Sequence, residues 1–235
     1  MNKTIHYFWF GRGEKSKLIQ KCIASWRAAF PDFAVKEWNE DSFDVRQNRF
    51  ISQAYDAKKY AFVSDYARFK VLFEEGGLYF DTDVEVLKPF EDLLETNDAI
   101  AAFEDDHYVA PGLILWVKKP GDPLMKTMTE LYERTAFLNE DGSQNALTIC
   151  KYFTAELEKN GLKKNDGSVQ RCAGFTVYPP EYFCPFNDLT GVMNQTENTK
   201  AVHWYAKTWL SKKDILRNKF SRRLHRVLGV DFFQK

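Results

Sequence analysis

The segment SDYARFKVLFEEGGLYFDTDVE, residues 64–85, decides the fold of this chain of 235 residues. Its first part has helical character and stops at a Gly-Gly pair, after which a short apolar strand, residues 78–80, leads into Asp-Thr-Asp. Side chains i and i+2 of a strand share a face, so Asp81 and Asp83 can converge on one ion once Thr82 turns away. A Mg²⁺ or Mn²⁺ ion held by one or two carboxylates keeps positions free for phosphate oxygens. The segment therefore predicts a strand-end cation site for a diphosphate.

A D-x-D pair alone also fits an ordinary surface turn, because aspartate is frequent where strands end. The neighbouring residues favour a site, since Asp65 and Arg68 lie one turn apart on the preceding helix and Tyr79 stands just before the carboxylates. Asp65 and Arg68 could instead form a simple i,i+3 ion pair worth about 0.2 to 0.5 kcal/mol.

The composition predicts one large domain with a substantial core, because 44% of residues are hydrophobic and 16% aromatic. The four cysteines are scattered without metal-ligand spacing, which favours reduced thiols in a cytosolic compartment. The apolar run 5–10 is too short for a signal peptide, and no run is long enough to span a bilayer. We therefore expect a cytoplasmic protein.

Hydrophobic periodicity predicts alternating strands and helices. The expected strands are 4–10, 33–38, 78–80, 99–103, 113–117, 175–178 and 200–205, and the expected helices are 15–30, two within 47–73, 123–137 and 145–157. This order favours an α/β sheet with sites at the carboxyl ends of its strands.

The C-terminal tail, residues 211–235, is basic and follows an expected single domain, residues 1–210. On a helix the tail would carry one apolar stripe, made of Leu216, Phe220, Leu224 and Val227. Such a helix is typical of attachment to an anionic membrane surface, although a helix packed on the domain with a solvated basic face is an equal alternative. Nucleic acid is not an expected partner, because the basic residues stand without a matching motif.

The segment as a whole resembles the core of the DxD-containing glycosyltransferases of family 32, which include bacterial capsular polysaccharide transferases, yeast initiating mannosyltransferases and, more distantly, the glucosylating domains of large clostridial toxins. The resemblance rests on SD-x-x-R with GG-x-Y-x-D-x-D, and extends to IHYFWFG (5–11), EWNEDSFD (37–44) and HWYAKTW (203–209). It implies a GT-A fold, which is a single Rossmann-like nucleotide-sugar-binding domain with a mixed central sheet.

The resemblance also implies roles for particular residues. Asp81, Asp83 and His203 would hold Mn²⁺ or Mg²⁺, with Asp83 as the direct ligand and Asp81 acting through water or on the hydroxyls of the donor. The implied catalytic residues are Asp65, Arg68, Asp81 and Asp83. The implied donor-binding residues are Trp9, Asp65, Arg68, Tyr79, Asp81, Lys207 and Trp209.

Trp9 matches a tryptophan that stacks on uracil in the toxin relatives, and the alternative is a core tryptophan at a strand end. Lys207 would contact the leaving phosphate. Thr208 stands where members of the family usually have serine, so the role of that hydroxyl stays open.

The implied reaction is metal-dependent transfer of a hexose, of the galactose or glucose type, from a UDP-sugar to a saccharide or lipid-linked oligosaccharide, with retention, in bacterial surface polysaccharide synthesis. The protein would work in the cytoplasm or on the inner face of the cell membrane. Candidate acceptor contacts are Glu104, Asp105, Asp106, Gln144 and Asn145, which could equally be solvated loop residues. The loops 104–112, 139–145 and 180–198 are expected to set specificity.

Two other functions compete with this one. A phosphohydrolase of the haloacid dehalogenase type also has D-x-D after a strand, with the first Asp as nucleophile, and residues 104–106 could imitate its acidic pair. That function leaves the Gly-Gly-x-Tyr sequence and His203 unexplained. A non-catalytic sugar-binding module on the same fold is the third possibility, against which the intact set of polar residues argues.

Overall fold

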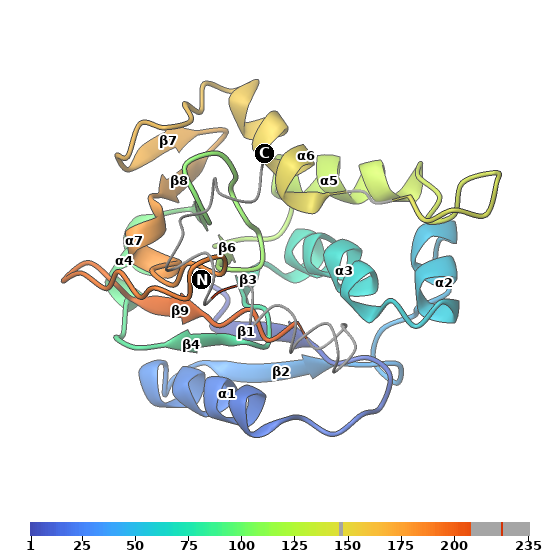
Figure 1. Ribbon diagram of the computed structural model, residues 1–235, viewed down its shortest axis with the longest axis horizontal. Coiled ribbons are helices and arrows are strands. Elements are labelled where there is room, and N and C mark those ends of the chain that lie inside the picture. Colours follow the sequence, from blue (N-terminus) through green and yellow to red (C-terminus); the bar gives the residue numbers. More distant parts are fainter. Residues whose placement is uncertain (146–147, 208–221, 223–235) are drawn as a thin grey trace.

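The computed structural model describes residues 1–145, 148–207 and Arg222, so Trp209 and the predicted tail helix lie outside the described residues (Figure 1). Within them a seven-stranded sheet has the order β2-β1-β3-β6-β5-β8-β7. In that order the strands are Ala34–Trp38, Thr4–Phe8, Gly77–Tyr79, Leu115–Val117, Ala99–Ala102, Phe175–Tyr178 and Gln170–Cys172. β1 is parallel to β2 and β3, whereas β6 is antiparallel to its neighbours β3 and β5. The sheet is therefore mixed, as predicted.

Helices cover both faces of this sheet. They are α1 (Lys17–Ala29), α2 (Arg49–Asp56), α3 (Tyr60–Glu75), α4 (Glu91–Thr96), α5 (Pro123–Glu133), α6 (Ile149–Glu158) and α7 (Pro180–Phe183). A second, two-stranded antiparallel sheet joins β4 (Val84–Val86) to β9 (Ala201–His203). Among the described residues, no helix is both long and apolar enough to cross a membrane.

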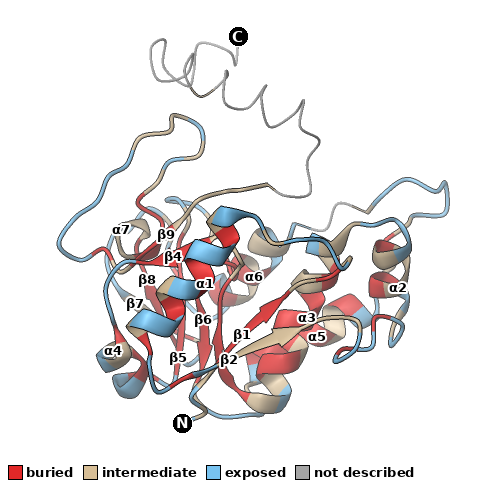
Figure 2. Ribbon diagram, turned by 90° about the horizontal axis from the view of Figure 1, so that it is seen from below, coloured by how far each residue is buried: buried red, intermediate tan, exposed pale blue. Residues whose placement is uncertain are grey.

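The core consists of two buried clusters, one on each face of the central sheet. Side chains alternate along a strand, so Ile5 and Tyr7 of β1 belong to the cluster beneath α1, whereas Phe8 belongs to the cluster beneath α3 and α5. Figure 2 shows the inner strands as buried and the edge strand β2 as mostly intermediate. This three-layer arrangement fixes the strand ends from which the site is built.

The Gly-Gly pair ends α3 and starts β3, as predicted. Gly76 and Gly77 have φ angles of 66° and 104°, a region that L-residues rarely adopt. A Cβ on Gly77 would lie 2.8 Å from the carbonyl oxygen of Thr4. Glycine therefore lets β3 enter the sheet directly beside β1, which brings the carboxyl ends of these two strands together.

The predicted strands and helices are confirmed, with shorter bounds at several ends. The strand expected at 4–10 ends at Phe8, and the helix expected from residue 145 begins at Ile149. The backbone N–H of Asn145 instead donates to the carbonyl of Phe137, 2.7 Å away. The elements β4, α4, β7 and α7 were not predicted, because segments of three to six residues are too short to show a period.

Candidate active site

The D-x-D segment follows β3 as a tight turn that is fixed by backbone hydrogen bonds. The N–H of Asp81 donates to the carbonyl of Gly112 (2.9 Å), and the N–H of Val84 donates to the carbonyl of Asp81 (3.1 Å). Val84 is paired with His203 across the small β4-β9 sheet. Asp83 and His203, 120 positions apart in the sequence, consequently lie side by side.

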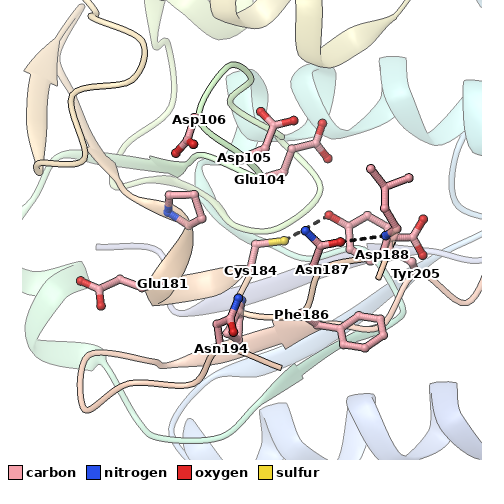
Figure 3. A pocket seen from close by; sticks show the side chains of 13 residues that line it. Glu104, Asp105, Asp106, Glu181, Cys184, Phe186, Asn187, Asp188, Asn194 and Tyr205 are labelled. Atoms are coloured by element: carbon pink, nitrogen blue, oxygen red, sulfur yellow. Dashed lines mark hydrogen bonds between the residues drawn. The ribbon is translucent and has the colours of Figure 1, made fainter. Parts of the chain in front are cut away.

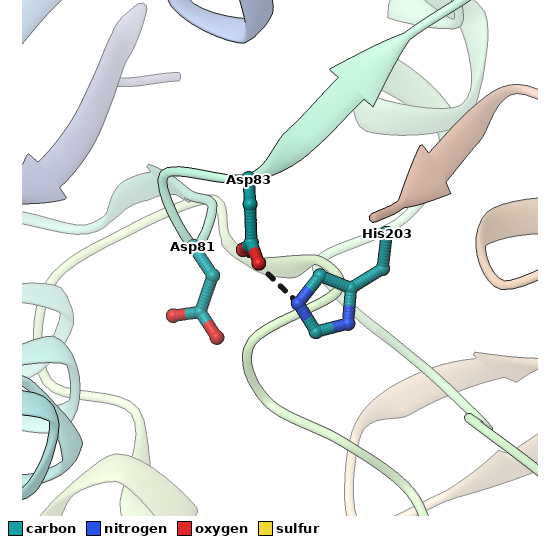
Figure 4. Close-up of side chains that lie close together, drawn as sticks. All are labelled: Asp81, Asp83 and His203. Carbon is teal, nitrogen blue, oxygen red and sulfur yellow. Dashed lines mark hydrogen bonds and ion pairs between the residues drawn. The ribbon is translucent and has the colours of Figure 1, made fainter. Parts of the chain in front are cut away.

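Asp81, Asp83 and His203 form a group whose ligand atoms all lie within 4.8 Å of one another. Figure 4 shows Asp83 between the other two side chains, with its Oδ1 3.0 Å from His203 Nε2. Its second oxygen accepts a hydrogen bond of 2.7 Å from the N–H of Ala206. The predicted metal ligands therefore come together from the turn after β3 and from β9, which are distant in the sequence.

Electrostatics at this group favour an ionised carboxylate. Burial alone would raise the pKa of Asp83, but the nearby His203 and the hydrogen bonds from His203 and Ala206 outweigh burial and lower it. Burial likewise opposes the charge on His203, and Asp83 reverses the effect, so the pKa of His203 is raised. Asp83 therefore carries a negative charge where a cation would meet it, and a metal ion would compete with a proton for Nε2 of His203.

The residues present fit a divalent cation. Two carboxylates and one imidazole are an oxygen and nitrogen donor set that suits Mn²⁺ and related ions. Asp83 Oδ1 and His203 Nε2 are hydrogen-bonded to each other at 3.0 Å, and the ligand atoms of all three residues are close enough to contact one ion.

Asp81 is held by a second network, on the side of α3. The Tyr79 hydroxyl donates to Asp81 Oδ1 at 2.5 Å, and Arg68 Nη2 lies 3.4 Å from the same oxygen. Arg68 Nη2 also lies 2.6 Å from Asp65 Oδ1, so the simple i,i+3 ion pair exists and faces the same cleft. The other oxygen of Asp81 lies against Gly112, where a Cβ would come within 2.0 Å of it.

This network is buried, which makes its charges interdependent. Arg68 is only 4% exposed and its guanidinium lies 4.8 Å from the centre of the Tyr79 ring. Burial raises the pKa of Asp65 to about 6, although the charge of Arg68 acts in the opposite direction. An arginine shared by two carboxylates in this setting fixes both of them, because a buried charge left alone is costly.

A cleft of about 530 Å³ opens above both networks. Its lining comprises aromatic side chains (Phe8, Trp9, Phe10, Tyr60, Tyr79 and Tyr205), basic ones (Lys58, Arg68 and Lys207), the acids Asp65, Asp81 and Asp83, and also Gly11, Gly13, Ala61, Ser64, Thr82 and His203. Of these, Lys58, Tyr60, Ser64 and Tyr205 were not predicted as site residues. Ser64 and Tyr205 belong to quoted motifs, SD-x-x-R and HWYAKTW, whereas Lys58 and Tyr60 lie in a segment without a recognisable pattern.

Trp9 follows the end of β1 and lines this cleft. It is partly exposed, unlike the fully buried Trp26 and Trp116, and its indole N–H donates to the carbonyl of Gly13 at 2.6 Å. The Lys15 ammonium lies 5.3 Å from the ring centre. Trp9 thus lines the cleft just after β1, and its stacking role stays a prediction.

Lys207 also lines the cleft, but its ammonium pairs with Asp188 Oδ2 at 2.6 Å. Arg222 pairs with the other oxygen of Asp188. Asp188 therefore anchors the segment after β9 at the edge of the site.

The predicted acceptor contacts fall into two groups. Asp105 and Asp106, with Glu104, line a second pocket of about 460 Å³ (Figure 3). Gln144 and Asn145 line neither cavity, since Gln144 forms a β-bridge with Leu138 and the amide of Asn145 donates to the carbonyl of Ala136.

Comparison with known proteins agrees with this geometry. Residues 16–100, a little over a third of the chain, match a family model described as the glycosyltransferase sugar-binding region containing a DXD motif. The match includes Asp65, Arg68, Asp81 and Asp83. No curated protein matches the sequence significantly.

Three solved structures are similar. The PaToxG glycosyltransferase has a TM-score of 0.50 and 20% identity over 67% of this chain and 69% of that one. A glycosyltransferase involved in glycosylation of the major capsid of PBCV-1 has a TM-score of 0.45 and 11% identity over 92% and 98%. The galactosyltransferase LgtC, in complex with donor and acceptor sugar analogues, has a TM-score of 0.41 and 12% identity over 94% and 94%. The chain has the GT-A fold, and the family match supports a glycosyltransferase.

Proposed function

We propose that this protein is a retaining, metal-dependent hexosyltransferase that uses a nucleotide sugar as donor. One observation carries the proposal. Asp81, Asp83 and His203 converge at the end of a cleft that also contains an aromatic face, Trp9, and a buried guanidinium, Arg68. A nucleoside diphosphate sugar needs these features together, because its base, its diphosphate and its hydroxyls have different chemistry.

Asp83 and His203, with Asp81 directly or through water, would hold Mn²⁺ or Mg²⁺ at the diphosphate. Such an ion, when bound, stabilises the charge that develops on the departing diphosphate. Lys207 lines the same cleft, and its ammonium would add a second positive charge for the phosphate oxygens. Its ion pair with Asp188 keeps it at that position before the donor arrives.

Asp65 and Asp81 would accept hydrogen bonds from the hydroxyls of the transferred sugar. A carboxylate accepts well from a vicinal diol, and Arg68 holds both carboxylates in place between them. Trp9 would stack on the base, for which uracil is our choice, with a hexose of the galactose or glucose type. Acceptors are a saccharide or a lipid-linked oligosaccharide, in the synthesis of bacterial surface polysaccharide.

The phosphohydrolase alternative is weaker on chemical grounds. It requires the first aspartate of the motif to attack phosphorus as a free carboxylate. Asp81 Oδ1 instead receives the Tyr79 hydroxyl and faces Arg68, and Oδ2 lies against Gly112. These contacts lower the nucleophilicity of the carboxylate and restrict its access.

The test is a screen of UDP-glucose, UDP-galactose and GDP-mannose for hydrolysis and for calorimetric binding, with Mn²⁺ and then with excess chelator. We expect a uridine donor to bind and hydrolyse only with metal. Asp83→Asn should lose both signals and keep a normal melting curve, because its strand-end carboxylate serves the ion. Asp98→Asn, at a side chain 88% exposed, is the matched control and should behave as wild type. Equal donor affinity with and without metal contradicts the proposal.

Attachment of the basic tail to the cytoplasmic face of the membrane is part of the proposal and rests on the sequence alone. Sedimentation with anionic liposomes at low salt, for the full chain and for a chain ending at Ser211, tests it. Equal sedimentation of both chains contradicts membrane attachment through the tail.

A further inference from the structure

The second pocket lies next to the cleft that contains Asp81, Asp83 and His203, called the metal cleft below, and the two cavities share one lining residue. Tyr205 lines both cavities, and its ring centre lies 4.1 Å from that of His203. The backbone of Tyr205 has a positive φ of 49°, an uncommon conformation that turns the chain between β9 and Lys207. Its hydroxyl is 3.1 Å from Cys184 Sγ, which fixes the ring between the two cavities. The Tyr205 ring, which lines the pocket, thus contacts His203, one of the predicted metal ligands.

The two walls of this pocket come from distant loops. Figure 3 shows Glu104, Asp105 and Asp106, which follow β5, on one side, and Glu181, Phe186 and Asn194 on the other. The second wall is held in shape by internal bonds. Glu181 accepts from Thr196 and Asn198, and Asn187 accepts from the N–H groups of Leu189 and Thr190.

The chemistry of the lining differs from that of the metal cleft. Among the residues that the structure describes, the metal cleft is lined by three basic side chains, whereas the second pocket is lined by five acids and by no Lys, Arg or His. As far as the described part of the chain shows, Asp188 is the one acid of this lining with cationic partners, namely Lys207 and Arg222. Burial, and then the neighbouring Asp105, raise the pKa of Glu104, so further negative charge is unfavourable here.

We propose that the second pocket binds the acceptor, and that the acceptor unit bound there is an uncharged saccharide. This inference rests on the proposed glycosyl transfer. Carboxylates and the amide of Asn194 supply hydrogen-bond partners for hydroxyls, and Tyr205 supplies an aromatic ring for the apolar side of a sugar ring. A carboxylate or phosphate on the same unit would face Glu104, Asp105, Asp106 and Glu181, for which the described residues provide no ion-pair partner. We therefore expect acidic sugars to bind more weakly than neutral ones.

Direct binding tests the ligand class. Saturation-transfer NMR on the wild-type protein would use the methyl glycosides of glucose and galactose and those of the two corresponding uronic acids. We expect signals from the neutral glycosides and at least about tenfold weaker binding of the uronides. Asp106→Lys should reduce the difference in binding between the neutral glycosides and the uronides. No signal from either neutral glycoside, or equal signals from the uronides, overturns the inference.

A steric variant tests the location. Asn194 is exposed and lines the pocket, so Asn194→Trp fills the cavity without removing the backbone bond from Asn194 to Pro185. Gln195→Trp adds the same side chain at the next exposed position, which does not line the pocket. We expect Asn194→Trp to lose the glycoside signal and to keep donor hydrolysis, and Gln195→Trp to keep both. Glycoside binding that survives Asn194→Trp unchanged overturns the location.

The two readouts separate the two proposals. Absence of donor binding and hydrolysis, with saccharide binding intact, contradicts the transferase function and the acceptor role of the pocket. Donor hydrolysis with unaltered saccharide binding in Asn194→Trp contradicts the pocket assignment alone.

Discussion

The metal cleft and the second pocket are neighbours built in opposite ways. The cleft takes its polar groups from the ends of adjacent strands and from α3, and ties them into one buried network around Arg68. The pocket takes its acids from two loops, and the side chains of Asp105 and Asp106 are exposed. A strand-end network keeps its geometry because the sheet fixes it, whereas a loop wall can change its residues at little cost to the fold. We therefore expect the cleft to hold the residues of the transfer chemistry, and the pocket to hold the residues that determine specificity.

The largest expected difference between the two regions is in stability. Arg68→Met leaves Asp65 and Asp81, which are both partly buried, without their shared cation, and should lower the free energy of unfolding by about 3 kcal/mol. Asp106→Asn in the pocket wall should change it by less than about 0.5 kcal/mol. Urea denaturation measures both. Similar values for the two variants would remove the distinction between a rigid cleft and a tolerant pocket.

The next prediction concerns the aromatic face of the cleft. Trp9→Ala should weaken donor binding by about 1 to 3 kcal/mol if the indole stacks on the base. Trp9→Phe keeps an aromatic face and should recover most of the affinity. Calorimetry with the donor from the screen gives the values, and melting curves verify the fold. Unchanged affinity in Trp9→Ala would return Trp9 to a packing role.

Gly112 gives a sharper test of how the cleft is assembled. A Cβ there would meet Asp81 Oδ2, so Gly112→Ala should destabilise the protein by about 1 to 3 kcal/mol through overpacking. In an Asp81→Ala background the same change should cost less than about 0.5 kcal/mol, because the opposing atom is gone. Gly13→Ala, where nothing lies within 4 Å of the added Cβ, is the control. Equal effects of Gly112→Ala in both backgrounds would mean that Gly112 does not position Asp81.

The last prediction concerns the pH dependence of the network around Arg68. Burial raises the pKa of Asp65 to about 6 from an ordinary 3.8, so the folded state binds this proton more tightly than the unfolded state. The resulting stabilisation is complete below about pH 4 and is lost as the pH rises through about 6. With chelator present, the stability of wild type relative to Asp65→Asn should therefore fall over that range and then level off. A rise over the same range would show that Asp65 is ionised more easily in the fold.

Local sequence signals were sufficient for the part of the site around β3. The Gly-Gly stop, the short strand and the D-x-D turn lie within ten residues, and their conformations depend on residue type and on the partner strand β1. Asp65 and Arg68 were predictable for the same reason, because helical spacing alone brings them together. Asp65 and Arg68 form the ion pair and also line the cleft, so the ion pair does not exclude the predicted role of these residues in the site.

Long-range contacts were not predictable from local patterns. His203 came from the family resemblance, because β9 has only three residues and pairs with a strand that periodicity does not reveal. Gly112 was missed because its importance depends on a carboxylate 31 positions earlier in the chain. Loops 104–112 and 180–198 were expected to matter and do form the second pocket, whereas loop 139–145 does not line it.

The pairing of β4 with β9 has a consequence for how the site is completed during synthesis. Asp81 and Asp83 are synthesised well before His203, the third member of the group, which joins them only when the chain has been extended past residue 200. A fragment that stops before β9 can contain the whole D-x-D motif and still lack the complete ion site. Recognition of the motif in a genome fragment therefore does not imply a functional centre, and cation affinity should appear only when the last strand has docked.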